Sequence, residues 1–191
     1  MAILTKISKQ FKNQPFSVKQ ALKAGFSRRE IQASYEARQI ERVARGVYQS
    51  VESEFSEDDL LQSAVLRVGL PSAICLISAL VHYHLTDIIP RKVWIMVPAS
   101  KHTTHGDLKL LRTRSPAWQV GIIQENGFQV TSLERTIIDC FIYRRLVGVN
   151  TFLDALKMAI EQKRTSPGKI LDMAIELKVD HRVRPYLEVY A

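Results

Sequence analysis

The order of helix signals within the first fifty residues constrains the fold of this chain more than any other feature. Ser17 is a suitable N-cap for a helix over residues 18–24, whose inward side chains we expect to be Val18, Ala21 and Leu22. Gly25 then marks a short turn. Ser27 caps the next helix, with Glu30 three residues later, where a capping box takes Glu or Gln. Two helices joined by a short turn that contains glycine are typical of the helix-turn-helix arrangement.

Helical and strand signals flank this pair. Residues 3–11 carry an apolar stripe that predicts a first helix. Residues 40–48 are rich in β-branched side chains and predict a short hairpin, with its turn around residues 44–46. The order helix, helix, turn, helix, hairpin therefore predicts a winged helix-turn-helix domain over residues 1–50.

The rest of the chain predicts a larger α/β domain over residues 57–191, with a small sheet and a helical C-terminal tail. Residues 51–59 are acidic and polar, typical of a linker, and Ser56 is placed to cap a helix over 57–68. Pro71 and Ser72 are expected to open a very apolar helix through Leu85. Short runs predict strands at 93–97, 108–112, 120–123 and 128–130. We expect an α+β protein of two domains.

Helical patterns return after the last strand. Thr131 and Glu134 have the spacing of a second capping box. Arg135 and Asp139 are spaced for an ion pair one turn apart, which we expect on the helix surface. Two more helices are predicted, over roughly 150–163 and 167–178.

Charge is distributed unevenly along the chain. Of the net charge of +8, residues 1–50 carry ten Lys/Arg against three Asp/Glu, residues 51–140 carry eight against ten, and residues 141–191 carry nine against six. A basic segment of this size favours a polyanionic partner such as nucleic acid. The alternative is a basic face that only confers solubility.

The helix after Gly25 supplies the candidate base contacts. At 100° per residue, Ile31 and Tyr35 define its buried side, and Arg29 and Gln32 point away from it. Arginine can bond guanine and glutamine can bond adenine in the major groove, whereas lysines and wing arginines suit phosphates. The predicted contacts with double-stranded DNA are Lys19, Lys23, Ser27, Arg28, Arg29, Gln32, Arg42 and Arg45. A three-helix protein-binding module is the alternative.

Other patterns favour neither a metal nor an enzyme. Two histidine pairs lack the spacing of a ligand set: His82 with His84, and His102 with His105. Glu161 and Lys163 match the short Glu-x-Lys element of nucleases, but they lie in helical periodicity rather than on a strand. We therefore expect no metal, no cofactor and no catalytic residue, with a nuclease-related enzyme as the least favoured alternative.

Compartment signals indicate the cytoplasm. The chain has no run of 18 apolar residues, and its first residues lack the pattern of a signal peptide. Cys75 and Cys140 both stand in apolar sequence, which is typical of buried thiols rather than a disulfide or metal pair. We expect a cytoplasmic protein with no membrane contact.

Several segments in series carry a family resemblance. They are Ser27–Ile31, Ile40–Tyr48, Leu76–Leu80 with Leu85, Val93–Pro98 and, most specifically, Gly127–Cys140 with its pattern V-T-S-x-x-R-T-x-x-D. These segments, which span about residues 17–140, resemble the AbiEi family of bacterial antitoxins from abortive-infection, type IV toxin–antitoxin systems. Residues 141–191 add nothing to the resemblance.

The resemblance implies a two-part protein. Its N-terminal domain would repress its own operon by binding inverted repeats, and its second domain would counteract a toxin resembling a nucleotidyltransferase without a stable complex. A transcriptional regulator with no toxin partner is the alternative for the whole chain. An oligomerisation or scaffolding module is the alternative for the second domain.

Overall fold

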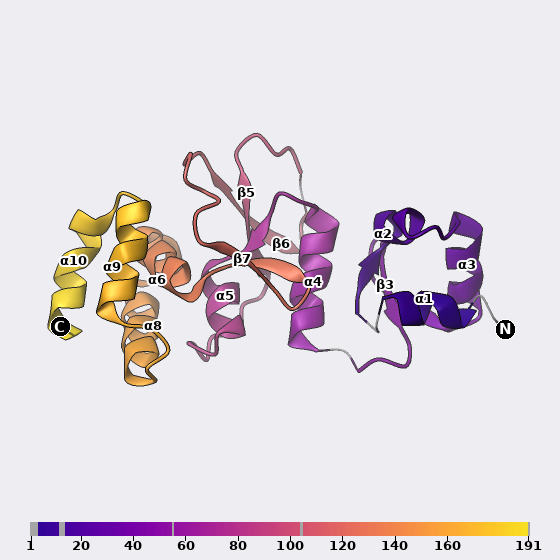
Figure 1. Cartoon of the computed structure of the whole chain (residues 1–191), viewed down its shortest axis with the longest axis horizontal. Helices are drawn as coiled ribbons and strands as arrows, with labels where there is room; N and C mark the ends of the chain where they lie inside the picture. Colours follow the sequence, from indigo (N-terminus) through magenta and orange to yellow (C-terminus); the bar gives the residue numbers. More distant parts are fainter. Residues whose placement is uncertain (1–3, 12–13, 55, 104, 191) are drawn as a thin grey trace. The chain divides into compact units, whose positions relative to one another are not determined.

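The computed structural model describes residues 4–11, 14–54, 56–103 and 105–190, and it divides the chain into two compact units, Met1–Leu70 and Pro71–Ala191. Figure 1 shows helices and strands in both units, so the predicted α+β class is confirmed. Each unit is described by itself below.

The first unit contains a three-stranded antiparallel sheet in the order β1-β3-β2. Its elements follow the predicted order, with one short strand added before the second helix; the predicted helix start at Ile3 lies outside the described residues. The elements are α1 (Leu4–Gln10), β1 (Phe16–Ser17), α2 (Val18–Lys23), α3 (Arg28–Glu36), β2 (Ile40–Ala44), β3 (Val47–Ser50) and α4 (Glu57–Val68).

Apolar side chains from α1, β1, α2, α3 and β2 form a buried core in the first unit: Ile7, Phe16, Ala21, Ile31 and Ile40. The burial of Ala21 and Ile31 agrees with the predicted inward faces of α2 and α3. This core positions the exposed faces of both helices.

The predictions that Leu22 and Tyr35 point inward are wrong. Leu22 is 39% exposed and Tyr35 is 43% exposed. In α3 the buried position next to Ile31 is taken by Ser34, whose hydroxyl donates to the Glu30 carbonyl oxygen at 2.9 Å. The buried face of α3 therefore runs through Ile31 and Ser34 and does not include Tyr35. The Tyr35 ring instead lies edge-on to the Tyr48 ring, with ring centroids 5.9 Å apart.

Helix α4 belongs to the first unit, whereas the sequence suggested that it opens the second domain. Ser56 caps it as predicted, accepting from the Asp59 backbone N–H at 3.1 Å. Gln62 donates to the Pro15 carbonyl oxygen at 3.2 Å, and Gln49 donates to Asp59 at 3.3 Å. These bonds tie α4 to the small sheet, so the division falls after Leu70.

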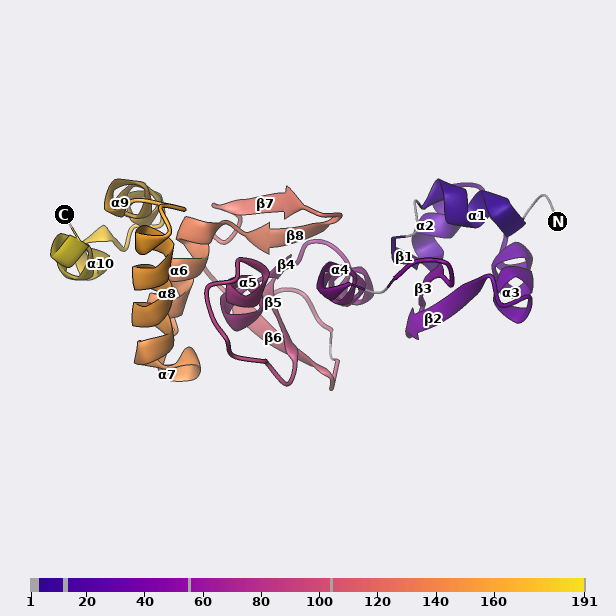
Figure 2. The same ribbon diagram turned by 90° about the horizontal axis from the view of Figure 1, so that it is seen from below.

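The second unit contains a mixed five-stranded sheet in the order β6-β5-β4-β8-β7. In Figure 2 helix α6 lies closest to this sheet among the C-terminal helices. The elements are β4 (Ala73–Ile74), α5 (Leu76–His82), β5 (Val93–Pro98), β6 (Leu108–Thr113), β7 (Ile122–Glu125), β8 (Phe128–Thr131), α6 (Leu133–Ile142), α7 (Arg144–Val147), α8 (Val149–Glu161), α9 (Pro167–Glu176), α10 (Asp180–Leu187) and the 3-10 helix η1 (Glu188–Tyr190).

The central strand β4 replaces the start of a predicted helix. The helix expected from Pro71 to Leu85 is shorter, running from Leu76 to His82. Ile74 instead pairs antiparallel with β5 and parallel with β8. An apolar run of this length suits either element, and here pairing with strands distant in sequence decides in favour of a strand.

The junction between β8 and α6 also differs from the prediction. The N-cap of α6 is Ser132, which accepts from the Arg135 backbone N–H at 3.3 Å, rather than Thr131. Thr131 ends β8 with its side chain fully buried. Elsewhere β7 begins at Ile122, two residues later than expected, and α10 was not predicted.

Candidate functional site

Helix α3 begins at a capping box, as the sequence predicts. The Ser27 hydroxyl accepts from the Glu30 backbone N–H at 3.2 Å, and the Glu30 carboxylate accepts from the Ser27 backbone N–H at 2.7 Å. The backbone N–H and the hydroxyl of Ser27, acting on this carboxylate, lower the pKa of Glu30, which keeps its negative charge beside the first turn of the helix. The Ser27 side chain is therefore engaged by the helix itself.

Two arginines in the first turn of α3 make the site strongly cationic. Arg28 and Arg29 are exposed, and within the described residues neither has an ion pair or hydrogen bond of its side chain. A helix N-terminus already carries a partial positive charge, so cations there do not help the helix. An anionic ligand bound at the start of α3 would offset the repulsion between these cations and the positive end of the helix.

Gln32 and Glu36 form a pair that the sequence prediction missed. The Gln32 side-chain amide donates to the Glu36 carboxylate at 2.8 Å, across one turn of α3. Their spacing of four residues was the available signal. Bidentate recognition of adenine uses the amide oxygen and one of the two amide hydrogens of glutamine, so the bond from the other hydrogen to Glu36 is compatible with base reading by Gln32.

The hairpin carries the remaining arginines. Arg45 lies exposed in the turn between β2 and β3, next to Gly46, whose φ of +76° suits glycine. The turn is joined to α2 because the Val18 backbone N–H donates to the Gly46 carbonyl oxygen at 3.1 Å. Arg42 is exposed on β2, with its Nε 3.4 Å from the Ala44 carbonyl oxygen.

Lys19 and Lys23 are exposed on α2. The structure thus places every predicted DNA contact on the surface of the first unit, on α2, on α3 or on the hairpin. Their contact with DNA stays a prediction. Further exposed cations that sequence reasoning did not select are Lys6 and Lys9 on α1 and Arg38 just after α3.

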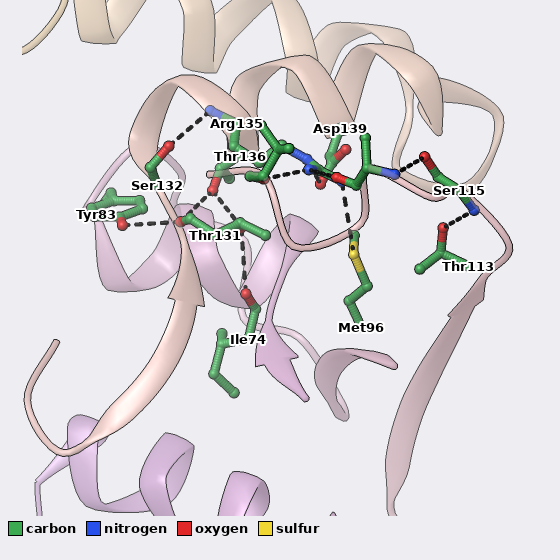
Figure 3. A network of polar contacts seen from close by, with 12 residues as sticks. Ile74, Tyr83, Met96, Thr113, Ser115, Thr131, Ser132, Arg135, Thr136 and Asp139 are labelled. Carbon is green, nitrogen blue, oxygen red and sulfur yellow. Dashed lines mark hydrogen bonds and ion pairs between the residues drawn. The ribbon is translucent and has the colours of Figure 1, made fainter. Parts of the chain in front are cut away.

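A second cluster of polar groups lies in the second unit, at the segment with the V-T-S-x-x-R-T-x-x-D pattern (Figure 3). Arg135 Nε donates to Asp139 Oδ2 at 2.9 Å, and Arg135 Nη1 donates to the Val120 carbonyl oxygen at 2.6 Å. Thr131 and Thr136 share a hydrogen bond of 2.7 Å between their hydroxyls.

The expectation that Arg135 and Asp139 form a surface pair is wrong. The two residues are 4% and 1% exposed. Burial raises the pKa of Asp139 to about 6, against the opposing effect of Arg135, so the carboxylate is charged at neutral pH. An ion pair this deep cannot touch a ligand from solvent, and it instead joins α6 to the segment before β7.

The two cysteines are buried and free, which confirms the predicted thiols. Burial raises the pKa of both Cys75 and Cys140, so both stay protonated at neutral pH and are poor nucleophiles. Among the residues that the structure describes, no group of three or more His, Cys, Asp or Glu side chains is placed to hold a metal ion.

Glu161, one half of the nuclease pattern, ends helix α8, and its carboxylate lies 3.9 Å from Lys157 on the same helix. Lys163 lies beyond the helix, with a φ of +55°. Glu161 also borders an open pocket of about 590 Å³ lined by residues 85–88 and by α8. Because the pair lies at the end of a helix rather than on strands, the structure lends no support to the nuclease alternative.

Neither the comparison with models of known protein families nor the comparison with curated proteins found a match for this chain. In the described part of the chain, none of the helices has the length and apolar character needed to cross a membrane.

Proposed function

We propose that the first unit is a winged helix-turn-helix domain that binds double-stranded DNA. Helix α3 is its recognition helix and the β2–β3 hairpin is its wing. The observation that carries this proposal is the exposure of Arg28 and Arg29 in the first turn of α3, without carboxylate partners within the described residues. In such domains the first turns of the recognition helix enter the major groove.

The exposed side chains have two kinds of role in this proposal, contact with bases and contact with phosphates. Arg29 reads guanine, and Gln32 reads adenine through its amide oxygen and one amide hydrogen. The exposed side chains of α2 and of the hairpin contact phosphates, which set the position of the protein without reading sequence: Lys19, Lys23, Arg42 and Arg45. Arg28, at the flank of α3, can contact either a base or a phosphate.

Fluorescence anisotropy with the DNA upstream of the protein's own gene tests these roles. We expect Arg29→Ala to weaken specific binding by roughly 1–3 kcal/mol and to relax sequence preference. Arg45→Ala should weaken binding to all sequences about equally. Lys169→Ala, which removes an exposed cation of the second unit, is the matched control. Unchanged binding by both arginine variants contradicts the proposal.

We further propose that the protein is an autoregulating antitoxin. It would bind inverted repeats upstream of its operon, and its second unit would counteract a toxin resembling a nucleotidyltransferase without forming a stable complex. The resemblance of residues 127–140 to the AbiEi family supports this. Because Thr131, Arg135 and Asp139 of that segment are buried, we assign them to the fold of the unit rather than to contact with a toxin.

Co-expression with the neighbouring gene tests the antitoxin part. The wild-type chain should restore growth and repress a reporter under the operon promoter. An Arg28→Ala/Arg29→Ala variant should restore growth but fail to repress, since DNA binding and antitoxicity would reside in different units. If the wild-type chain represses the reporter but never restores growth, the alternative of a regulator without a toxin partner is correct.

A further inference from the structure

The open pocket beside α8 combines carboxylates with an apolar floor. Its volume of about 590 Å³ lies within the range that is usual for ligand sites. Leu85, Ile88 and Met158 supply apolar surface, which we call the floor. Asp87, in the loop after α5, and Asp154, on α8, supply carboxylates from two different elements. All of these residues belong to the second unit, and we call the site the α8 pocket.

The charge of the α8 pocket is negative, although the chain as a whole carries +8. Among the described residues that line it, Asp87, Asp154 and Glu161 carry carboxylates, and Lys157 is the cation. Lys157 lies 3.9 Å from Glu161 on the same helix, so these two charges largely offset each other. In the described part of the chain, Asp87 and Asp154 have neither an ion pair nor a hydrogen bond of the side chain. The pocket therefore offers two unpaired carboxylates to a cation.

Exposed aliphatic side chains border the α8 pocket. Ile89, which directly follows the lining residues of the loop, is 92% exposed, more than any other large hydrophobic side chain that the structure describes. On α8, Leu153 is exposed, with Val149 exposed one turn before it. Leu153 is three residues from Asn150 and four from Lys157, which both line the pocket, so it adjoins the pocket on the helix surface. Exposed apolar side chains gathered in this way mark an interaction site.

The combination of carboxylates and aliphatic side chains decides which class of partner fits. Nucleic acid and anionic membranes carry negative charge, which the carboxylates repel. A free polyamine would pair with the carboxylates but leave Ile89 and Leu153 uncovered. Lysine and arginine side chains carry a cationic head on a hydrocarbon stem, and in protein interfaces they lie among apolar side chains. The α8 pocket therefore matches a protein segment in which a lysine or arginine stands beside apolar residues.

We propose that the α8 pocket docks a protein partner through a basic anchor, a lysine or arginine side chain of that partner. The stem of the anchor packs on the floor, and its cationic head pairs with Asp87 and Asp154. Aliphatic residues beside the anchor pack on Ile89 and Leu153. This inference goes beyond the proposed function and does not rest on it, because none of these residues belongs to the proposed DNA contacts.

The test screens the full-length protein, labelled with a fluorophore, against an array of random peptides. The test variant is Asp87→Asn/Asp154→Asn, which keeps the size of both side chains and removes both charges. The matched control is Asp172→Asn/Glu176→Gln, which removes the same charge from exposed positions of α9. Peptides that bind the wild type and the control but not the test variant are then titrated by fluorescence anisotropy.

We expect the selected peptides to contain a lysine or arginine next to leucine, isoleucine or phenylalanine. The test variant should weaken their binding about tenfold, because two exposed ion pairs are lost. Ile89→Ser should weaken it about fivefold through the loss of apolar contact, and the control variant less than about twofold. Tryptophan fluorescence confirms that each variant is folded.

An array in which no peptide distinguishes the wild type from the test variant overturns the inference. So do peptides without lysine or arginine that bind as tightly as the others. If spermidine binds as tightly as the selected peptides and Ile89→Ser binds them like the wild type, the site takes a small cation and the inference is wrong. If the wild type self-associates in sedimentation velocity and the test variant does not, the occupant is a second copy of this chain instead.

The two proposals fail independently. The test variant should bind operator DNA at least as tightly as the wild type, because it changes no proposed DNA contact. The Arg28→Ala/Arg29→Ala variant should bind the selected peptides like the wild type. Specific DNA binding that survives this arginine variant contradicts the proposed function, whatever the peptide titrations show.

Discussion

Replacing Arg135 with methionine tests how the second unit is held together. Methionine keeps an unbranched side chain but donates no hydrogen bond. The Asp139 carboxylate, which is 1% exposed, then loses its charge partner at 2.9 Å. The Val120 carbonyl oxygen loses a donor at 2.6 Å.

The expected loss follows from these two contacts. Breaking a buried ion pair by removing one partner costs about 3–5 kcal/mol, because an unpaired charge stays buried. An orphaned acceptor adds about 1–3 kcal/mol where water cannot reach it, but Val120 is half-buried and water can replace its donor. We expect Arg135→Met to lower the free energy of unfolding by about 4 kcal/mol.

Urea unfolding followed by tryptophan fluorescence is the assay. The only two tryptophans of the chain, Trp94 and Trp118, both lie in the second unit, so their signal reports on this unit. Arg135→Met/Asp139→Leu should recover most of the loss, because no unpaired charge remains. A loss below about 1 kcal/mol in the single variant, or no recovery in the double variant, refutes the reasoning.

The pH dependence gives an independent check on the same variant. Burial raises the pKa of Asp139 to about 6 although Arg135 opposes the rise, so removal of Arg135 raises that pKa further. A carboxyl group with a higher pKa in the folded than in the unfolded state destabilises the protein as pH rises through the folded-state pKa. The deficit of Arg135→Met should therefore be largest near about pH 8 and shrink toward about pH 5.

Three further variants test local features. Gly121→Ala should lower the free energy of unfolding in urea by about 1–3 kcal/mol, because φ at this position is +68° and an added Cβ would lie 2.9 Å from the Cβ of Arg135. The control Gly106→Ala, whose added Cβ would have no atom within 4 Å, should change this free energy little. Ser56→Ala should lower the stability of the first unit by about 1 kcal/mol through loss of a helix cap, as followed by circular dichroism. Glu36→Ala should tighten DNA binding by roughly 0.3–1 kcal/mol in anisotropy titrations, because it removes a negative charge that the DNA phosphates repel.

The sequence predicted best the features that depend on neighbouring residues. The capping box at Ser27, the N-cap at Ser56 and the hairpin turn at Gly46 are formed by residues within a few positions of one another, so local spacing was sufficient. The same holds for the exposure of Arg28 and Arg29 at the start of α3, which follows from the helix period once the buried face includes Ile31.

Features that depend on distant partners were missed. The local pattern around Ile74 suits a helix as well as a strand, and the partners that decide between them lie in β5 and β8. The spacing of Arg135 and Asp139 indicated an ion pair but not its burial, which comes from the surrounding sheet and helices.

The two-residue strand β4 has a consequence for how this protein is made. It joins the β6–β5 half of the sheet to the β8–β7 half, yet it leaves the ribosome before any of those strands. The Thr131 hydroxyl, which donates to the Ile74 carbonyl oxygen, belongs to a residue synthesised 57 positions later. Until Thr131 has been synthesised, the edge of β4 that later pairs with β8 stays unpaired in the nascent chain. The speed of translation between residues 74 and 131 therefore sets how long this apolar edge is exposed to aggregation.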